Sequence, residues 1–196
     1  MSRRPFLAVA LLVAAASAAG AQSSAHATLT PEQQIVAAVQ AMPAHMHDGA
    51  TVLGYRDGKL TTLRKGTNQM TCLAPDPKRA EFHVACYHDG MEPFMARGRE
   101  LRASGTTGAQ VDTVRYAEVK SGKLALPKLP ASLYTLTGGN FDPATGKVTG
   151  AGALYVVYVP YATSATTGIS DKPSRTSPWL MFPGTPKAHI MIVGSM

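Results

Sequence analysis

The chain has 196 residues, of which 45% are hydrophobic and 16% charged, with 19 lysines and arginines against 12 aspartates and glutamates. This length accommodates one domain with a sizeable core and is short for two. The net charge of +7 can favour anionic molecules, but it names no partner; an anionic ligand and an envelope component are the candidates, and nucleic acid is not expected.

The amino terminus has the three-part layout of a secretory signal peptide. Arg3 and Arg4 precede an apolar run over residues 6–16, and small residues continue to Ala21. A transmembrane helix needs about 20 apolar residues, so no segment of the mature chain is expected to span a membrane. We expect residues 1–21 to be a signal peptide, cleaved after Ala18 or Ala21, and residues 22–196 to be a single periplasmic or secreted α+β domain.

The first helix of the mature chain is marked by the sequence Thr30-Pro31-Glu32-Gln33, which has a capping-box arrangement. Apolar residues at positions 35, 36, 39 and 42 then recur at helical spacing. Pro43 disfavours helical geometry at the residue before it, so a short amphipathic helix is predicted to end near Met42.

Four potential metal ligands follow within six residues. Imidazoles suit Cu(II) and thioethers suit Cu(I) in an oxidising compartment, so this segment suggests a copper site. The alternative is an exposed link between the helix and the next strand. The four residues are Met42, His45, Met46 and His47.

Two strands are predicted over residues 51–56 and 59–64, because Asp57-Gly58 between them suits a two-residue type I′ turn. Residues 66–68 then turn the chain towards the next strands. Since consecutive strands usually lie next to one another, we expect an antiparallel meander here.

The two cysteines lie on strand-like runs over residues 69–74 and 81–88, joined by a proline-rich loop. Strand alternation places Cys72 and Cys86 among apolar neighbours, where a disulfide would form if they lie opposite one another. Closing a loop of this length contributes roughly 3 kcal/mol on the chain-entropy model.

Two alternatives use the same thiols. Cys86 would act as a nucleophile with His88 as its base, or both cysteines would join His83 and His88 in a metal site. Both hypotheses need reduced thiols, which an oxidising compartment disfavours.

The densest basic cluster includes a helix predicted over residues 92–102. Guanidinium groups grip carboxylates and phosphates in bidentate fashion, so this cluster is a candidate anion site. The alternative is that these side chains are only solvated. The cluster consists of Arg97, Arg99 and Arg102 on the helix, with Lys78 and Arg79 on the preceding loop.

The remaining pattern predicts a helix between residues 111 and 122, an irregular turn over residues 141–146, and four strands. The strand over residues 153–159 is apolar on both faces and should therefore be central. His189 on the last strand is expected to be a packed, hydrogen-bonded residue. The other three strands cover residues 133–137, 179–182 and 188–193.

A hydroxyl-rich loop over residues 161–170 follows directly from the buried strand, in the position where binding loops often project. Its side chains would contact a small polar ligand, or they would only hydrogen-bond locally. They are Thr163, Ser164, Thr166 and Thr167.

Together these elements predict a single α+β domain, with a mainly antiparallel sheet of six to eight strands, two or three covering helices and one disulfide. The chain lacks the short motifs of serine hydrolases, P-loop and dinucleotide enzymes and zinc proteases. We therefore expect a non-enzymatic binding or structural protein without a cofactor. The alternatives are a copper-binding protein and a Cys/His-dependent enzyme.

Three runs of the sequence resemble small exported bacterial proteins of an uncharacterised family. The resemblance implies export and a recurrent domain, and it implies no activity, cofactor or catalytic residue. The runs are GATVLGYRDGKLTTLRKGTNQMTCLA, FHVACYHDGMEPFMARGREL and PWLMFPGTPKAHIMI.

Overall fold

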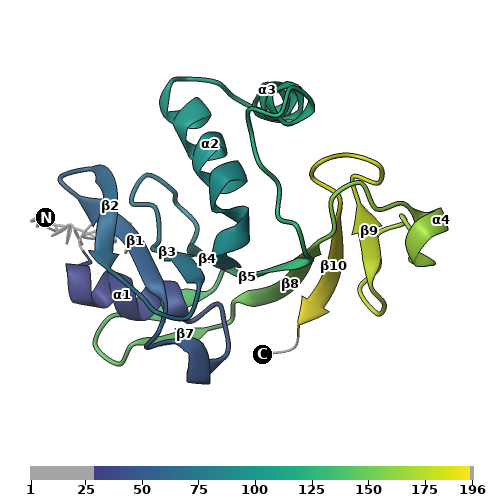
Figure 1. Ribbon diagram of the computed structural model, residues 1–196. Coiled ribbons are helices and arrows are strands. Elements are labelled where there is room, and N and C mark those ends of the chain that lie inside the picture. The colour runs from purple at the N-terminus through teal and green to yellow at the C-terminus, as the bar shows by residue number, and fades with distance from the viewer. Residues whose placement is uncertain (1–28, 195–196) are drawn as a thin grey trace, which may run out of the picture.

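One eight-stranded, mostly antiparallel sheet organises residues 29–194, the part of the chain that the computed structural model describes. Its strands lie in the order β2-β1-β3-β4-β5-β8-β10-β9 (Figure 1). The predicted α+β class is confirmed. The strands are β1 Thr51–Arg56, β2 Lys59–Arg64, β3 Met70–Leu73, β4 His83–His88, β5 Ala131–Thr137, β8 Gly152–Tyr158, β9 Trp179–Met181 and β10 His189–Gly194.

The sheet departs from the expected meander at β1, which pairs antiparallel with β2 on one side and parallel with β3 on the other. The link from β2 to β3 passes the start of β1 at Gly66. A β-carbon at residue 66 would lie 2.2 Å from the backbone nitrogen of Thr51, so glycine permits this close passage. The expectation of consecutive antiparallel pairing was therefore wrong at this point.

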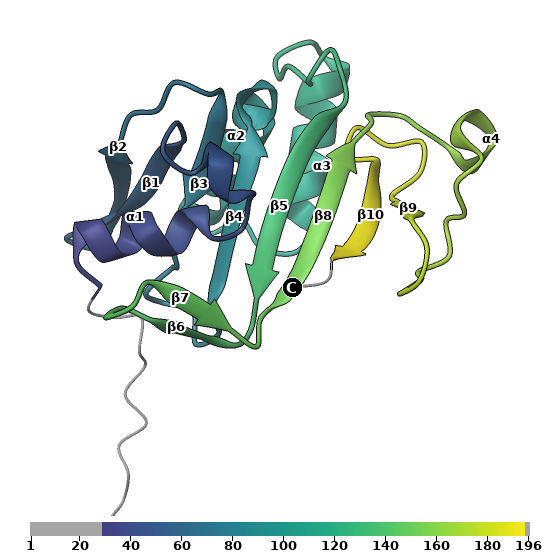
Figure 2. The same ribbon diagram turned by 90° about the horizontal axis from the view of Figure 1, so that it is seen from below.

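Helices cover both faces of the sheet (Figures 1 and 2). On one face lie α1 (Pro31–Val39) and a small hairpin of β6 (Asn140–Asp142) and β7 (Lys147–Thr149). On the other face lie α2 (Glu92–Ala103) and α3 (Ala109–Lys120). Short helical turns η1 (Ala44–Met46), η2 (Asp89–Met91) and α4 (Ser164–Thr167) occur in the connections.

Each covering layer has its own core. Beneath α1, the core includes Ala37, Val52 and Val84 and encloses both cysteines. Beneath α2, the aromatic rings of Tyr87 and Phe94 are almost fully buried. The sheet therefore separates two apolar layers, each of which stabilises the helices that cover it.

The amino-terminal helix begins as the sequence predicts. The Thr30 hydroxyl accepts from the Gln33 backbone nitrogen at 3.3 Å, and the Gln33 side chain accepts from the Thr30 nitrogen at 3.0 Å, which completes the capping box. The buried Gln34 side chain bonds both the backbone nitrogen and the carbonyl of Tyr55. These two hydrogen bonds fix α1 to β1. The helix ends at Val39, three residues earlier than predicted.

The predicted disulfide is confirmed. Cys72 on β3 lies directly opposite Cys86 on β4, their sulfurs are bonded, and neither residue is exposed to solvent. The alternation that places both side chains on the α1 face explains why they meet.

The later elements largely follow the sequence pattern. β8 is flanked by β5 and β10, as its two apolar faces predict. His189 is buried, and its Nδ1 atom lies 2.6 Å from the Lys187 carbonyl. The turn predicted over residues 141–146 is instead part of the β6–β7 hairpin, and the loop over residues 161–170 contains α4. Within residues 29–194, no helix is long and apolar enough to cross a membrane.

Candidate functional site

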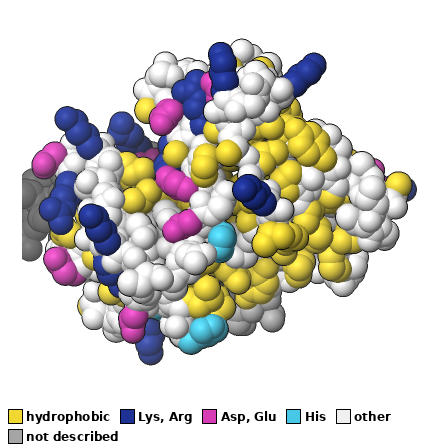
Figure 3. Space-filling view, viewed as in Figure 1, with side chains coloured by type: hydrophobic (Ala, Val, Ile, Leu, Met, Phe, Trp, Pro, Cys, Tyr) yellow, Lys and Arg dark blue, Asp and Glu magenta, His cyan; other side chains and the backbone are white. Residues whose placement is uncertain are grey.

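An arginine-lined cleft of about 430 Å³ lies between α2 and the strands β1 to β4. It brings together three members of the predicted basic cluster, one from the β3–β4 loop and two from α2. In Figure 3, lysine and arginine side chains gather over the β1–β2 side of the molecule and around α2. The cleft is lined by Tyr55, Leu60, Leu73, Ala74, Asp76, Arg79, His83, Arg99 and Arg102.

Arg99 is held in place by a network beneath the cleft. Its Nη1 atom donates to the Tyr87 hydroxyl at 2.8 Å, and its Nη2 atom donates to Glu92 at 2.6 Å. The Tyr87 hydroxyl also donates to Glu92. Burial and the hydrogen bond with Glu92 raise the pKa of Tyr87, so this hydroxyl stays protonated and Arg99 is positioned before any ligand arrives.

Arg102 and Arg79 are less constrained. The Nη1 atom of Arg102 donates only to the Gly98 carbonyl at 3.0 Å, and among residues 29–194 no carboxylate pairs with it. Arg79 forms an ion pair with Glu81 at 3.2 Å. Because this pair is exposed, it is weak, and solvent or a ligand can replace Glu81 as the partner of Arg79. Arg102 therefore carries the least compensated positive charge in the cleft.

Two further titratable groups line the wall opposite α2. Burial, with the nearby Asp76 carboxylate, raises the pKa of Tyr55 to about 12, so its hydroxyl is neutral at physiological pH. The His83 Nδ1 atom lies 2.8 Å from the Thr137 hydroxyl. Burial lowers the pKa of His83, and the positive charge of Arg79 lowers it further. The cleft therefore contains neutral hydrogen-bonding groups beside its arginines.

Acidification should destabilise the protein through His83. Because its pKa is lowered in the folded state, the unfolded chain binds a proton at a higher pH than the folded chain does. The stabilisation provided by the neutral ring is present above about pH 6.5 and is lost as the pH falls through the folded-state pKa. Urea unfolding at pH 7.5 and 5.5 should show this loss, and His83→Gln should reduce it. An unchanged pH dependence in the variant would contradict the assignment.

The apolar part of the lining indicates which kind of ligand the cleft suits. Leu60 is exposed on β2 and Leu73 is half-buried on β3. Ala74 is the residue that follows β3. A mostly apolar cavity with a few convergent polar groups is the usual form of a small-molecule site. The arrangement suits a molecule that carries a carboxylate or phosphate next to an apolar portion.

Two groups of predicted ligand residues lie outside the cleft. Arg97 is on α2 but turns towards α3, where its Nη2 atom pairs with Glu118 at 2.6 Å. Three of the four hydroxyls bond locally: Thr163 caps α4 through Thr166, and Thr167 donates to the Thr163 carbonyl. The Ser164 hydroxyl is buried and has no hydrogen-bond partner within residues 29–194. Purely local hydrogen bonding therefore does not account for Ser164.

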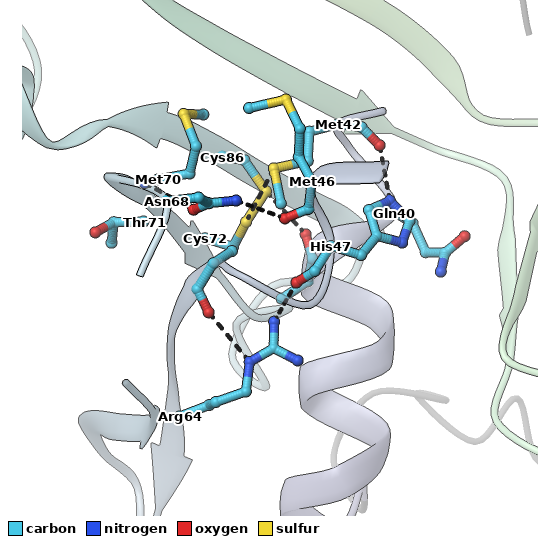
Figure 4. Close-up of a disulfide and its surroundings, with 12 residues drawn as sticks. Gln40, Met42, Met46, His47, Arg64, Asn68, Met70, Thr71, Cys72 and Cys86 are labelled. Carbon is cyan, nitrogen blue, oxygen red and sulfur yellow. Dashed lines mark hydrogen bonds between the residues drawn. A yellow bond between two sulfur atoms is a disulfide. The ribbon is translucent and has the colours of Figure 1, made fainter. Parts of the chain in front are cut away.

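The two methionines of the predicted copper segment both contact the first core, whereas His47 hydrogen-bonds the backbone (Figure 4). The Met42 sulfur is buried 3.9 Å from the Cys72 sulfur, and the His47 Nε2 atom lies 2.8 Å from the Met42 carbonyl oxygen. His45 is exposed on η1, and Met46 is half-buried against the first core. Among residues 29–194, no three His, Cys, Asp or Glu side chains form a metal-binding group.

The proposed Cys86–His88 pair lacks a free thiol, because Cys86 is bonded to Cys72. The Nδ1 atom of His88 accepts a hydrogen bond from the Gly90 nitrogen at 3.0 Å and caps η2. His83 belongs to the opposite face of the sheet from the disulfide. This geometry provides neither an activated cysteine nor a thiolate-based metal site.

Five lining residues were not identified as site residues from the sequence, namely Tyr55, Leu60, Leu73, Ala74 and Asp76. The cross-strand register places Tyr55 opposite Leu60, which the Asp-Gly turn between them already implies. Their proximity to α2 depends on long-range packing and has no local sequence signal.

Comparison with known proteins adds no functional assignment. No family model, curated protein or solved structure matches the chain. The resemblance to small exported bacterial proteins therefore stays a prediction. The predicted signal peptide over residues 1–21 lies outside the described residues.

Proposed function

We propose that this protein is an exported, non-enzymatic binding protein that holds a small anionic molecule in the arginine-lined cleft. The observation that carries the proposal is the convergence of Arg79, Arg99 and Arg102 on one cavity of about 430 Å³. This volume falls within the range of roughly 300 to 1,000 Å³ that is typical of small-molecule sites.

Arg102 provides the charge that favours an anion, since the carboxylate of Asp76 in the lining lies beside Tyr55 on the opposite wall. Glu92 holds Arg99 from below, and Glu81 lies beside Arg79, but Arg102 has no carboxylate partner within residues 29–194. A carboxylate or phosphate would complete its hydrogen bonds in bidentate fashion. The Tyr55 hydroxyl is neutral and hydrogen-bonds Asp76 on the wall opposite α2.

Export is proposed on two grounds. The amino-terminal sequence has the layout of a signal peptide. The Cys72–Cys86 disulfide is the kind of bond that persists in oxidising compartments outside the cytoplasm.

Isothermal titration calorimetry at low ionic strength tests the anion site, with citrate and inorganic phosphate as separate probes. Arg102→Ala should weaken binding of the preferred probe about tenfold or more, because a hydrogen bond to a charged group contributes roughly 1.5 to 3 kcal/mol. Arg97→Ala is a matched control, since Arg97 lies on the same helix and pairs with Glu118 instead.

The result with Arg97→Ala decides between a specific site and general attraction. We expect this variant to keep its affinity within about twofold of the wild-type value, although it removes the same formal charge. Equal losses in both variants, or no heat of binding from either probe, would contradict the proposal.

A further inference from the structure

The outer edge of β2 offers a second surface directly beside the cleft. β2 is the terminal strand of the sheet, and its residues 59–62 are exposed. No other strand within residues 29–194 pairs with this edge. A terminal strand of this kind presents backbone donors and acceptors to any extended chain that can approach it.

The register with β1 identifies which backbone groups face outwards. Arg56 pairs with Lys59 across the two-residue turn, followed by Tyr55 with Leu60 and Gly54 with Thr61. Hydrogen-bonded and non-hydrogen-bonded pairs alternate along an antiparallel ladder. The backbone N–H and C=O groups of Leu60 and Thr62 therefore point away from β1.

Charge limits which chains can pair with this edge. Lys59 begins the exposed stretch, Lys65 follows β2, and Arg56 lies across the turn, against one exposed carboxylate at Asp57 in the turn itself. Figure 3 shows more lysine and arginine than aspartate and glutamate side chains over this side of the molecule. The surplus of lysine and arginine over aspartate and glutamate repels a second copy of the chain, whereas a negatively charged strand is attracted.

We propose that an extended acidic peptide segment adds to the outer edge of β2 as a further antiparallel or parallel strand. Its backbone pairs with Leu60 and Thr62, and alternate side chains point to the face on which Leu60 lines the cleft. A carboxylate on that face lies on the same side of the sheet as Arg102. The inference deepens the proposed anion-binding function and rests on it.

Fluorescence anisotropy tests the inference with a labelled ten-residue peptide of alternating glutamate and valine. Thr62→Pro removes an outward N–H without removing a bond to β1, so proline is compatible with this edge position. It should weaken peptide binding about tenfold or more, since backbone hydrogen bonds contribute roughly 1 kcal/mol each and the ring also obstructs the approaching strand. Thr62→Ala should stay within about twofold of the wild type.

A second measurement avoids any effect of proline on folding. The same peptide with N-methyl groups on alternate residues should bind the wild-type protein at least about tenfold more weakly, because it lacks the donors of one edge. A peptide of alternating lysine and valine should not bind. Equal affinity for the methylated and unmethylated glutamate peptides would overturn strand addition.

Citrate titration of the same proteins separates this inference from the cleft itself. Thr62→Pro should bind citrate as the wild type does, while Arg102→Ala should lose affinity for citrate and for the glutamate peptide. Citrate binding without peptide binding would overturn the β2 inference and leave the anion site standing. Failure of both ligands would overturn both proposals.

Discussion

Replacing Cys72 and Cys86 together with alanine should lower the free energy of unfolding by about 3 kcal/mol, because the bond closes a loop with a sequence separation of 14. For a domain of this size, the midpoint of thermal unfolding should fall by roughly 6 to 12 °C. Both residues are fully buried among apolar side chains between α1 and the sheet, so alanine is a better replacement than serine, which would bury two hydroxyls there. Urea unfolding followed by circular dichroism measures the change.

The reduced wild-type protein is the control for this substitution. It should unfold near the urea midpoint of the double alanine variant, since both lack the covalent link. Because neither sulfur is exposed, reductant should act only when the protein unfolds. A double variant as stable as the oxidised protein would show that the bond does not stabilise this sheet.

Asp112→Ala should be the second strongly destabilising change, by roughly 3 kcal/mol, at the lower end of the range for breaking a buried ion pair because Asp112 is 23% exposed. Asp112 on α3 accepts from both Arg115 and Lys187, the latter at 2.8 Å. The Arg115 side chain is only 5% exposed and lies over the Phe94 ring at 3.9 Å. Removing the carboxylate leaves this buried cation without its counterion.

A double-mutant cycle separates the charge effect from packing. Arg115→Met keeps the apolar contact with Phe94 and removes the buried charge, so Asp112→Ala should cost much less in that background. Asp171→Ala is an exposed control and should change stability by less than about 0.5 kcal/mol. Additive losses for Asp112 and Arg115 in urea unfolding would contradict the coupling.

Local features of the fold could be predicted because the residues that determine them are neighbours in the sequence. The Thr30–Gln33 capping box and the Asp57-Gly58 turn each involve four residues or fewer, and both occur as expected. Asp57 and Gly58 both adopt positive φ, as a type I′ turn requires. The facing of Cys72 and Cys86 follows from strand alternation once the hairpin register is known.

The order of the strands could not be predicted in the same way. The parallel pairing of β1 with β3 depends on the close passage of Gly66 over the start of β1, a contact between backbones 15 residues apart. Hydrophobic periodicity indicates that a segment is a strand, but it does not indicate which other strand it pairs with. The local meander was therefore the simpler expectation and was wrong at one pair.

The residues of the candidate site could likewise be predicted only in part. Guanidinium chemistry identified Arg79, Arg99 and Arg102 as possible anion ligands, but it also selected Arg97, which pairs with Glu118 across the α2–α3 contact. Only the packing of α3 against α2 distinguishes these arginines. Asp76 was missed because a single carboxylate in a proline-rich loop has no distinctive pattern.

Amide NMR spectra of the isotopically labelled protein during titration with citrate test most directly whether the cleft binds an anion. Saturable shifts are expected only in the cleft, at residues such as Leu73, Arg79, His83 and Arg102, with Arg97 and the turn at residues 164–167 unchanged. Shifts centred on that turn or on His45 and His47, or no saturable shifts at all, would contradict the assignment of the cleft as the anion-binding site.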